Sequence, residues 1–297
     1  MPVDAGAPAV ALGAALNKPV AGEASHVLPP ASAPAAHTDD EYGEMTTGAH
    51  QHIFDSFKLE NGQVLEQVHV DYSTYGTLNA ARDNVLVVCH ALTGNANLHT
   101  WWGGLLGPAR AFDTDRYFIV CANILGSCYG TTGPASPHPR DPNHRPYRHR
   151  FPNVTVRDTV HLHARLLTEV LHVTAIPCVV GGSLGGMQTL EWAASYPDLV
   201  QSFITIACGP DHSPWQIAFG EVQRQAIYAD PCWQEGNYTA EAPPTRGLAV
   251  ARQMAMVSYR TPQAYEHKFA RRTNDRQGTS QCLLAQQALH GWLIAVV

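Results

Sequence analysis

Short, continuous apolar runs alternate with longer amphipathic stretches through the middle of the chain. Four such runs stand out: Asn84–Cys89, Tyr117–Cys121, Ile176–Val180 and Phe203–Ala207. Runs of this length without polar alternation are typical of strands that are buried on both faces. Apolar residues recur with a period close to 3.6 over Val156–Val173, which predicts a helix with one apolar face. A second helix is predicted over Met187–Tyr196, before Pro197. Strands that alternate with helices indicate an α/β protein with a mostly parallel sheet.

The segments on either side of this alternation have different patterns. Ser56–Leu59 and Val64–Val70 flank Asn61-Gly62, which predicts a tight hairpin with two residues suited to positive φ. The strand pattern stops after Gly209. Three helices are predicted beyond it, with a loop over Glu235–Pro244 between the first two: Trp215–Tyr228, Gly247–Tyr259 and Pro262–Arg271. A helical run in this place is typical of a lid over the carboxyl edge of the sheet, where such sheets bind ligands.

The first 48 residues differ in composition from the rest of the chain. They are rich in Ala and Pro, and Lys18 is the single basic residue among the first forty. We expect a disordered leader, without the positive start of a signal peptide or the arginines of a mitochondrial presequence. The predicted organisation is therefore a leader (1–48), an α/β core (49–210), a helical lid (211–272) and an atypical tail (273–297).

Composition narrows the possible functions. The net charge is −6 and only 15% of residues are charged, which argues against binding nucleic acid through a basic surface. No apolar stretch is long enough to span a membrane. The seven cysteines include no Cys-x-x-Cys pair and favour a reducing compartment, so we expect a cytoplasmic protein. The sixteen histidines lack the spacing of metal ligands, since His161 and His163 lie about 200° apart around the predicted helix, and no metal is expected.

Gly181-Gly182-Ser183-Leu184-Gly185 carries the clearest chemical signal. It follows a predicted buried strand and precedes a predicted helix. In that context G-x-S-x-G forms a sharp strand-to-helix turn that lifts the serine hydroxyl above the sheet edge. Ser183 is the candidate nucleophile. The alternative is a glycine-rich turn with an inert serine.

Two further loops follow predicted strands. His90–Gly94 comes directly after the first buried strand, where the α/β-hydrolase fold supplies one oxyanion N–H, and the residue after the nucleophile supplies the other. The backbone amides of Leu92 and Leu184 are therefore the candidate oxyanion donors. We interpret His90 as a loop histidine bonded to backbone, because the base follows the serine in this fold. Gly126–Pro134 lacks the G-K-[ST] ending of a phosphate-binding loop, so a turn-rich loop near the active-site mouth is the preferred interpretation.

Taken together, these motifs resemble the homoserine O-acetyltransferase family over about His52–Arg271. Further matching segments are Gly182–Gln188 with Glu191-Trp192, Gln223–Ile227 with Asp230-Pro231, Gly247–Ala249 with Ala251-Arg252, and Ser258–Arg260. The resemblance implies an α/β-hydrolase fold with helices on both faces and a helical lid. It also implies transfer of an acetyl group from acetyl-CoA to the hydroxyl of L-homoserine, in methionine biosynthesis. An acyl-serine intermediate, no bound cofactor and a homodimer formed through the lid are further implications.

The same resemblance assigns roles to individual residues. It makes Ser183 the nucleophile, Arg252 the partner of the substrate carboxylate and Tyr259 its neighbour in the active-site tunnel. Arg252 and Tyr259 are seven positions apart, so a helix projects them from one face. A solvated arginine and a packing tyrosine are the alternatives that the spacing alone leaves open.

This chain departs from the family pattern in its catalytic Asp and His, and that departure leaves alternative functions open. The family's catalytic Asp and His come late in the chain, after the lid. The histidines after Ser183 are His212, His267 and His290, and none follows a buried strand, so none is assigned as base. We therefore expect the C-terminal strands and two triad members to be missing. The edge at Phe203–Ala207 is then expected to be unpaired unless Leu283–Val297 covers it, with poor solubility and no transfer activity. An esterase, a serine or other alcohol acyltransferase, a succinyl donor and a non-catalytic homologue remain alternatives.

Overall fold

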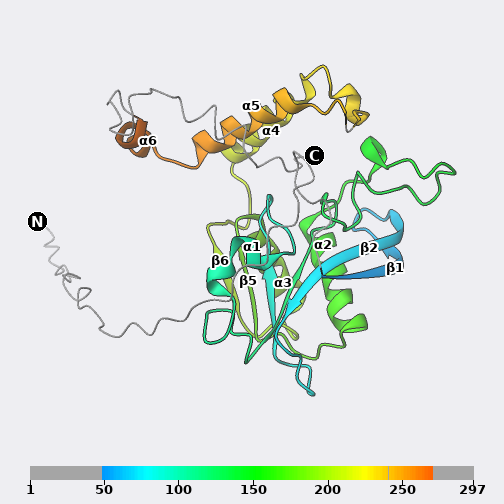
Figure 1. Ribbon diagram of the computed structural model, residues 1–297, viewed down its shortest axis with the longest axis vertical. Coiled ribbons are helices and arrows are strands. Elements are labelled where there is room, and N and C mark those ends of the chain that lie inside the picture. The colour runs from blue at the N-terminus through cyan, green and yellow to red at the C-terminus, as the bar shows by residue number, and fades with distance from the viewer. Residues whose placement is uncertain (1–48, 240, 270–297) are drawn as a thin grey trace, which may run out of the picture. The chain divides into compact units, whose positions relative to one another are not determined.

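The computed structural model describes residues 49–239 and 241–269 (Figure 1). The leader at 1–48 and the tail at 273–297 lie outside these residues. The six strands form one sheet in the order β1-β2-β4-β3-β5-β6. Their bounds are β1 His50–Lys58, β2 Val64–Tyr75, β3 Val85–Cys89, β4 Phe118–Ala122, β5 Cys178–Gly182 and β6 Phe203–Ile206. Neighbours from β4 through β3 and β5 to β6 are parallel, whereas β2 is antiparallel to both β1 and β4. The predicted mostly parallel sheet is confirmed.

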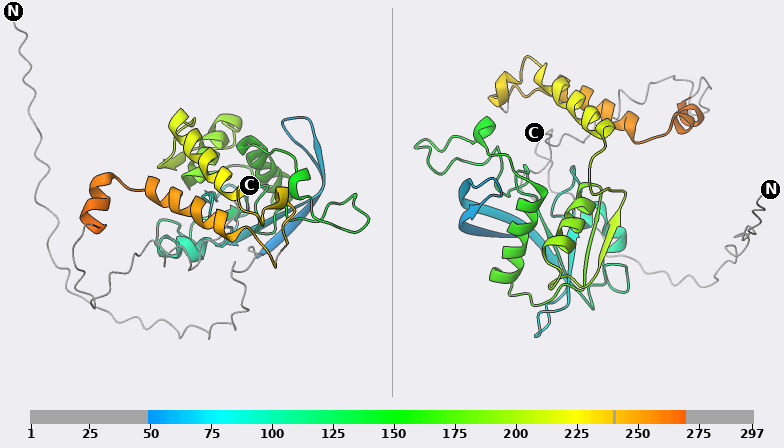
Figure 2. Two further views of the ribbon diagram at one scale, coloured as in Figure 1. Left: turned by 90° about the horizontal axis from the view of Figure 1, so that it is seen from above. Right: turned by 180° about the vertical axis from the view of Figure 1, so that it is seen from behind.

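The central strands are buried on both faces, as their apolar runs predict. In β3, Val85 and Val87 belong to one apolar layer, while Leu86 and Val88 belong to the other. The first layer lies under helices α2 (Val156–Arg165) and α3 (Leu184–Ser195), as Figure 2 shows. The second layer lies under the short helix α1 (Leu98–Trp101) and the 3-10 turn η1 (Gly103–Leu105). The sheet is thus covered on both sides.

The long helix predicted over Val156–Val173 changes its winding part-way. Regular α2 gives way at Leu166–Val170 to a π-helical segment, η3, in which the Leu171 N–H donates to the Leu166 carbonyl. A π segment is a local one-residue widening of a helix. Leu166 and Leu167 stay fully buried in it, so the apolar face continues across the change.

The hairpin predicted around Asn61-Gly62 is present between β1 and β2, but its turn is not the predicted two-residue type. The Leu59 N–H donates to the Gln63 carbonyl, so the loop contains three residues rather than two. Only Gly62 has positive φ, at 87°, and the Asn61 side chain accepts from the Gln63 N–H instead. Three-residue hairpin loops require a single left-handed position, which glycine fills without strain.

The prediction that Phe203–Ala207 is buried on both faces is wrong. Phe203 is 49% exposed and Ile204 is 53% exposed, and all residues of β6 are classed as exposed. Among the described residues, β5 is the only strand that pairs with β6. An apolar run shows that a strand can be buried, but burial also requires neighbours that the run does not encode.

Helices account for most of the described residues after β6. These are α4 (Pro214–Tyr228), the 3-10 turn η4 (Gln234–Gly236), α5 (Thr245–Ser258) and α6 (Pro262–Phe269). The first two long helices pack closely, because a Cβ at Gly247 would lie 2.5 Å from the Ala226 carbonyl oxygen. Asp230 locks this contact by accepting a 2.8 Å hydrogen bond from the Gly247 N–H. In the described part of the chain, no helix has the length and apolar character needed to cross a membrane.

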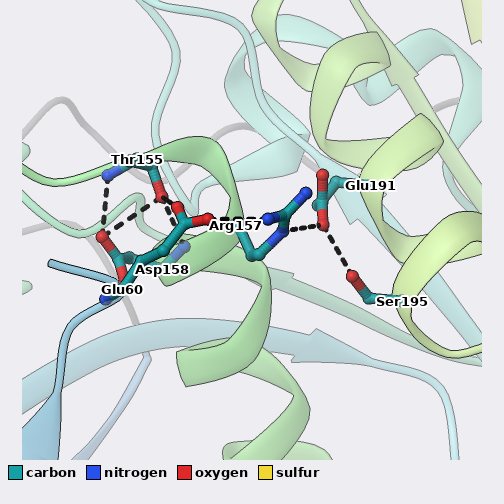
Figure 3. A network of polar contacts seen from close by, with 6 residues as sticks. All are labelled: Glu60, Thr155, Arg157, Asp158, Glu191 and Ser195. Atoms are coloured by element: carbon teal, nitrogen blue, oxygen red, sulfur yellow. Dashed lines mark hydrogen bonds and ion pairs between the residues drawn. The ribbon is translucent and has the colours of Figure 1, made fainter. Parts of the chain in front are cut away.

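A polar network joins the hairpin, α2 and α3 (Figure 3). Thr155 caps α2, and the Asp158 carboxylate accepts from the Thr155 N–H at 2.9 Å and from the Glu60 N–H at 2.7 Å. Arg157 forms ion pairs with Glu60 at 2.6 Å and with Glu191 at 2.7 Å. Asp158 is 1% exposed, whereas the Arg157 side chain is 49% exposed. The buried carboxylate therefore holds the N-terminus of α2 against the hairpin turn.

We predict that Asp158→Ala costs about 2–4 kcal/mol of unfolding free energy, because it leaves two backbone N–H groups without their acceptor. The matched change Arg157→Ala removes two exposed ion pairs and should cost less than about 1 kcal/mol. Urea unfolding of both variants measures the difference. Equal losses would contradict the importance given to the cap.

Candidate active site

Ser183 occupies a strained turn between β5 and α3. Its backbone lies at φ 56° and ψ −124°, outside the regions that L-residues usually adopt. The Ser183 N–H donates to the Ile206 carbonyl at 2.9 Å, and the Ser183 carbonyl accepts from the Met187 N–H. The side chain is exposed, and its hydroxyl has no hydrogen-bond partner among the described residues. Strain at an exposed serine is typical of a nucleophile turn.

Glycines make this turn possible by allowing backbone to touch backbone. A Cβ at Gly181 would lie 2.3 Å from the Gly185 oxygen, and one at Gly185 would lie 2.1 Å from the Cys89 oxygen. A Cβ at Gly186 would lie 2.6 Å from the Cys208 sulfur. These contacts are shorter than any side chain allows. They also explain why α3 begins at Leu184, before the predicted start at Met187.

The two candidate oxyanion donors come from different segments that meet at this contact. The Leu184 N–H is the first of α3, where no residue of the preceding turn can accept it. Leu92 lies in the turn that the Gly94 N–H closes onto the Ala91 carbonyl at 2.9 Å. Neither amide donates a hydrogen bond to another described residue. Two uncommitted N–H groups, on segments that meet at the turn of an exposed serine, are the elements that an oxyanion site requires.

His90 is a loop histidine bonded to backbone, as interpreted from the sequence. It is 1% exposed, its Nδ1 donates to the Ala91 carbonyl at 2.8 Å and its Nε2 accepts from the Ile124 N–H at 3.2 Å. Burial lowers the pKa of His90 to about 4, so the ring is neutral near pH 7. The Gln188 Nε2 donates to the His90 carbonyl at 3.2 Å and to the Leu184 carbonyl at 3.4 Å. Gln188 therefore ties the oxyanion loop to the nucleophile helix.

Asn123 organises the loops around the site, a role that the sequence motifs did not indicate. Its Oδ1 accepts from the Ala96 N–H at 2.7 Å, and its Nδ2 donates to the Tyr129 carbonyl. Its backbone N–H donates to the Asp71 carbonyl, and its own carbonyl accepts from the Nε2 of His163 at 3.0 Å. The sequence signal that could have found it is the position of Asn123, a polar residue directly after the buried strand β4.

The loop Gly126–Pro134 is fixed to strand β2. The Thr131 hydroxyl accepts from the Asp71 N–H, and the Thr132 hydroxyl accepts from the His69 N–H at 2.8 Å. The two threonines thus bind this loop along β2. With Tyr129 held by Asn123, the loop borders the oxyanion segment.

The remaining predicted residues lie on or beyond the helices after β6. Arg252 is half-buried on α5 and has no ion-pair partner among the described residues. Tyr259 is the C-cap of α5 and is 65% exposed. In the described part of the chain, no hydrogen bond joins the Ser183 hydroxyl to either side chain, or to His212 or His267. His290 lies outside the described residues. Within 49–239 and 241–269, no cluster of His, Cys, Asp or Glu could hold a metal ion.

Comparison with known proteins places this geometry in a family. Residues 84–294 match the family model described as alpha/beta hydrolase fold. A homoserine O-acetyltransferase of Salinibacter ruber is 49% identical over 78% of this chain and 67% of its own length. A homoserine O-acetyltransferase of Nostoc punctiforme is 55% identical over 72% of this chain. The chain belongs to the homoserine O-acetyltransferase family. It spans 60% of the length of that curated relative.

Solved structures with the same fold carry two kinds of name. Homoserine O-acetyltransferase from Bacillus anthracis matches with a TM-score of 0.69 and 28% identity, over 81% of this chain and 69% of that one. Esterase E22 matches with a TM-score of 0.70 and 27% identity, over 81% of this chain and 72% of that one. The fold is therefore shared with a homoserine O-acetyltransferase and with an esterase.

We predict that acid destabilises the protein through its two buried histidines. Burial lowers the pKa values of His90 and His163 from 6.5 to about 4. Between about pH 7 and pH 5 the unfolded chain gains these protons and the native state does not. Each histidine should then cost about 2 kcal/mol of unfolding free energy.

Urea unfolding at the two pH values measures this loss. His163→Gln keeps an N–H donor for the Asn123 carbonyl and should remove about half of the pH dependence. An unfolding free energy that is the same at both pH values would show that the rings are protonated in the native state.

Proposed function

We propose that this protein is an acyltransferase that moves an acetyl group from acetyl-CoA to the hydroxyl of L-homoserine, in methionine biosynthesis. The observation that carries the proposal is the exposed, strained Ser183 flanked by the uncommitted Leu92 and Leu184 amides, in a chain of this family. Acetyl-CoA is the acyl donor substrate, and the proposal needs no bound cofactor.

The proposed reaction proceeds through an acyl-serine. The Ser183 oxygen bonds to the thioester carbonyl carbon, the carbon–sulfur bond breaks with its electron pair on sulfur, and the serine proton ends on that sulfur to give free CoA. The oxygen of the homoserine hydroxyl then bonds to the acyl carbon, the bond to the serine oxygen breaks, and the hydroxyl proton passes to Ser183, which gives free Ser183 and O-acetylhomoserine. In each step the oxyanion would be held by the Leu92 and Leu184 amides, each contributing roughly 2.7–4 kcal/mol. Ser183 is the proposed nucleophile and the Leu92 and Leu184 amides are the proposed donors, and no hydrogen bond joins the Ser183 hydroxyl to a base among the described residues.

Arg252 is the proposed clamp for the acceptor. A half-buried guanidinium without an ion-pair partner carries a desolvation cost that a carboxylate ligand relieves. Guanidinium binds carboxylate through two parallel hydrogen bonds, which fits the α-carboxylate of an amino acid. Tyr259, at the end of the same helix, is proposed to line the approach to the nucleophile.

The helices after β6 are also proposed to form a homodimer. Trp215 is 71% exposed on α4, and Val257 is 52% exposed on α5. Apolar side chains of this size on the surface are typical of an interface. The six cysteines in the described part of the chain are free, which fits the reducing environment of the cytoplasm, the proposed location.

An esterase is the second candidate function, supported by the likeness to esterase E22. Both reactions share the acyl-serine and differ in whether homoserine or water receives the acetyl group. Exclusion of water from the acyl-serine favours transfer.

We predict that acetyl-CoA acetylates Ser183 and that L-homoserine discharges the acetyl group as O-acetylhomoserine. Mass spectrometry of the intact chain measures the adduct, which Ser183→Ala should abolish. Ser202→Ala is the matched control, because Ser202 is an exposed serine whose hydroxyl donates to the Pro177 carbonyl. Release of acetate alone would favour the esterase, and no adduct on Ser183 would reject both functions for this chain.

A further prediction separates the acceptor site from the nucleophile. Arg252→Gln should raise the KM for L-homoserine by about tenfold or more, because the charged partner of the carboxylate is lost. The rate of Ser183 acetylation by acetyl-CoA should stay within about twofold, since the donor half-reaction does not involve the acceptor. Arg246→Gln, on the first turn of the same helix, is the control. A slower acetylation with an unchanged KM would contradict the assigned role.

A further inference from the structure

The loop His138–Arg150 is the most basic segment in the described part of the chain. It contains four arginines and three histidines, with Asp141 as its single carboxylate. Three of the arginines have partners: Arg140 pairs with Glu66, and both Arg145 and Arg150 pair with Asp141. Arg148 is different. Its guanidinium is half-buried and has no ion-pair or hydrogen-bond partner among the described residues.

The backbone holds Arg148 in an unusual conformation. Its φ is +53°, in the left-handed region that an L-residue rarely adopts, and its N–H donates to the Pro134 carbonyl at 2.7 Å. A half-buried and unpaired guanidinium is costly, and an anionic ligand would offset that cost. The other three arginines of the loop each have a carboxylate partner, so Arg148 is the one whose charge is left unpaired among the described residues.

A series of aromatic rings lies beside this arginine. The ring of Trp233 lies 5.3 Å from that of Tyr228 and 5.7 Å from that of Tyr238, both at shallow angles. Gly236 fits between this series and the basic loop, since its Cβ would lie 3.5 Å from the Trp233 ring and 3.7 Å from the His149 Cβ. The Tyr238 hydroxyl lies within electrostatic range of both Arg148 and Cys128.

A chain of contacts connects this arrangement to the oxyanion segment. Cys128 precedes Tyr129, whose carbonyl is held by Asn123, and Asn123 also holds the oxyanion segment at Ala96. A ligand on Arg148 and Tyr238 would therefore border the loop that leads to Ser183. The pairing of a guanidinium with flat aromatic surfaces is the chemistry that binds phosphate and a nucleobase together.

We propose that Arg148, with the rings of Tyr238 and Trp233, binds the adenine-nucleotide end of the acyl-CoA donor. The guanidinium takes a phosphate of the nucleotide, and the aromatic rings stack on the adenine. The pantetheine arm then runs past Cys128 toward the nucleophile. The physiological role of this site rests on the proposed acetyl transfer, but the binding of a nucleotide can be measured without it.

The test uses adenosine 3′,5′-bisphosphate, which carries the adenine and the 3′-phosphate of CoA but no thioester. Calorimetric titration into the full chain should show binding that weakens as salt is raised, because the contact is ionic. Arg148→Gln should weaken binding by about tenfold or more, whereas Arg148→Lys should restore part of it. Arg140→Gln removes the same charge from the same loop and should change binding by less than about twofold, since Arg140 is exposed and paired with Glu66.

The outcomes separate this inference from the proposed function. Equal effects of Arg148→Gln and Arg140→Gln, or no binding of the bisphosphate by a chain that acetylates Ser183, would overturn the nucleotide site and leave acetyl transfer standing. Arg148-dependent binding without acetylation of Ser183 would support the site and reject the transfer. Thermal unfolding of each variant excludes loss of the fold as the cause, and Tyr238→Leu should weaken binding by a second route through lost stacking.

Discussion

The direct contact between the start of α3 and the end of β3 is the constraint on which the candidate site depends. The Gly185 backbone lies so close to the Cys89 carbonyl that no side chain fits between them. Because of this contact, the nucleophile turn and the oxyanion loop are neighbours. Gln188 then fixes their relative position through the His90 carbonyl. A larger residue at Gly185 would separate Ser183 from Leu92 while leaving both in the chain.

Titratable side chains in the core differ in their partners from the two arginines that are proposed to bind substrate. In the core, Asp158 and His163 are buried, and each is satisfied by backbone groups, so neither is available to a ligand. Around the site, Arg148 and Arg252 are half-buried without partners among the described residues. The backbone hydrogen bonds of Asp158 and His163 stabilise the fold. The unpaired guanidinium groups of Arg148 and Arg252 can instead gain electrostatic free energy when an anionic ligand binds. Two guanidinium groups with different surroundings fit the two anionic groups of the proposed substrates, a phosphate of the donor and the carboxylate of the acceptor.

The sequence predicts those features that local pattern determines. The apolar run of β3 correctly indicates burial on both faces, and the position of His90 before Ser183 in the chain correctly argues against a base. Pattern fails where the outcome depends on tertiary neighbours. The same kind of run in β6 is exposed, since burial requires covering elements. Asn61-Gly62 forms a longer loop than predicted, and the partnering that distinguishes Arg148 from Arg140 exists only in three dimensions.

Asn123 has a consequence for how this part of the molecule can change in evolution. Both halves of its side-chain amide are in use, the oxygen on the Ala96 N–H and the nitrogen on the Tyr129 carbonyl. Aspartate would lose the donor, serine would be too short for both contacts, and glutamine would need one more methylene in a site that is fully buried. None of these three single substitutions keeps both hydrogen bonds of Asn123. A lineage could alter the oxyanion loop only by changing the loop and its anchor together.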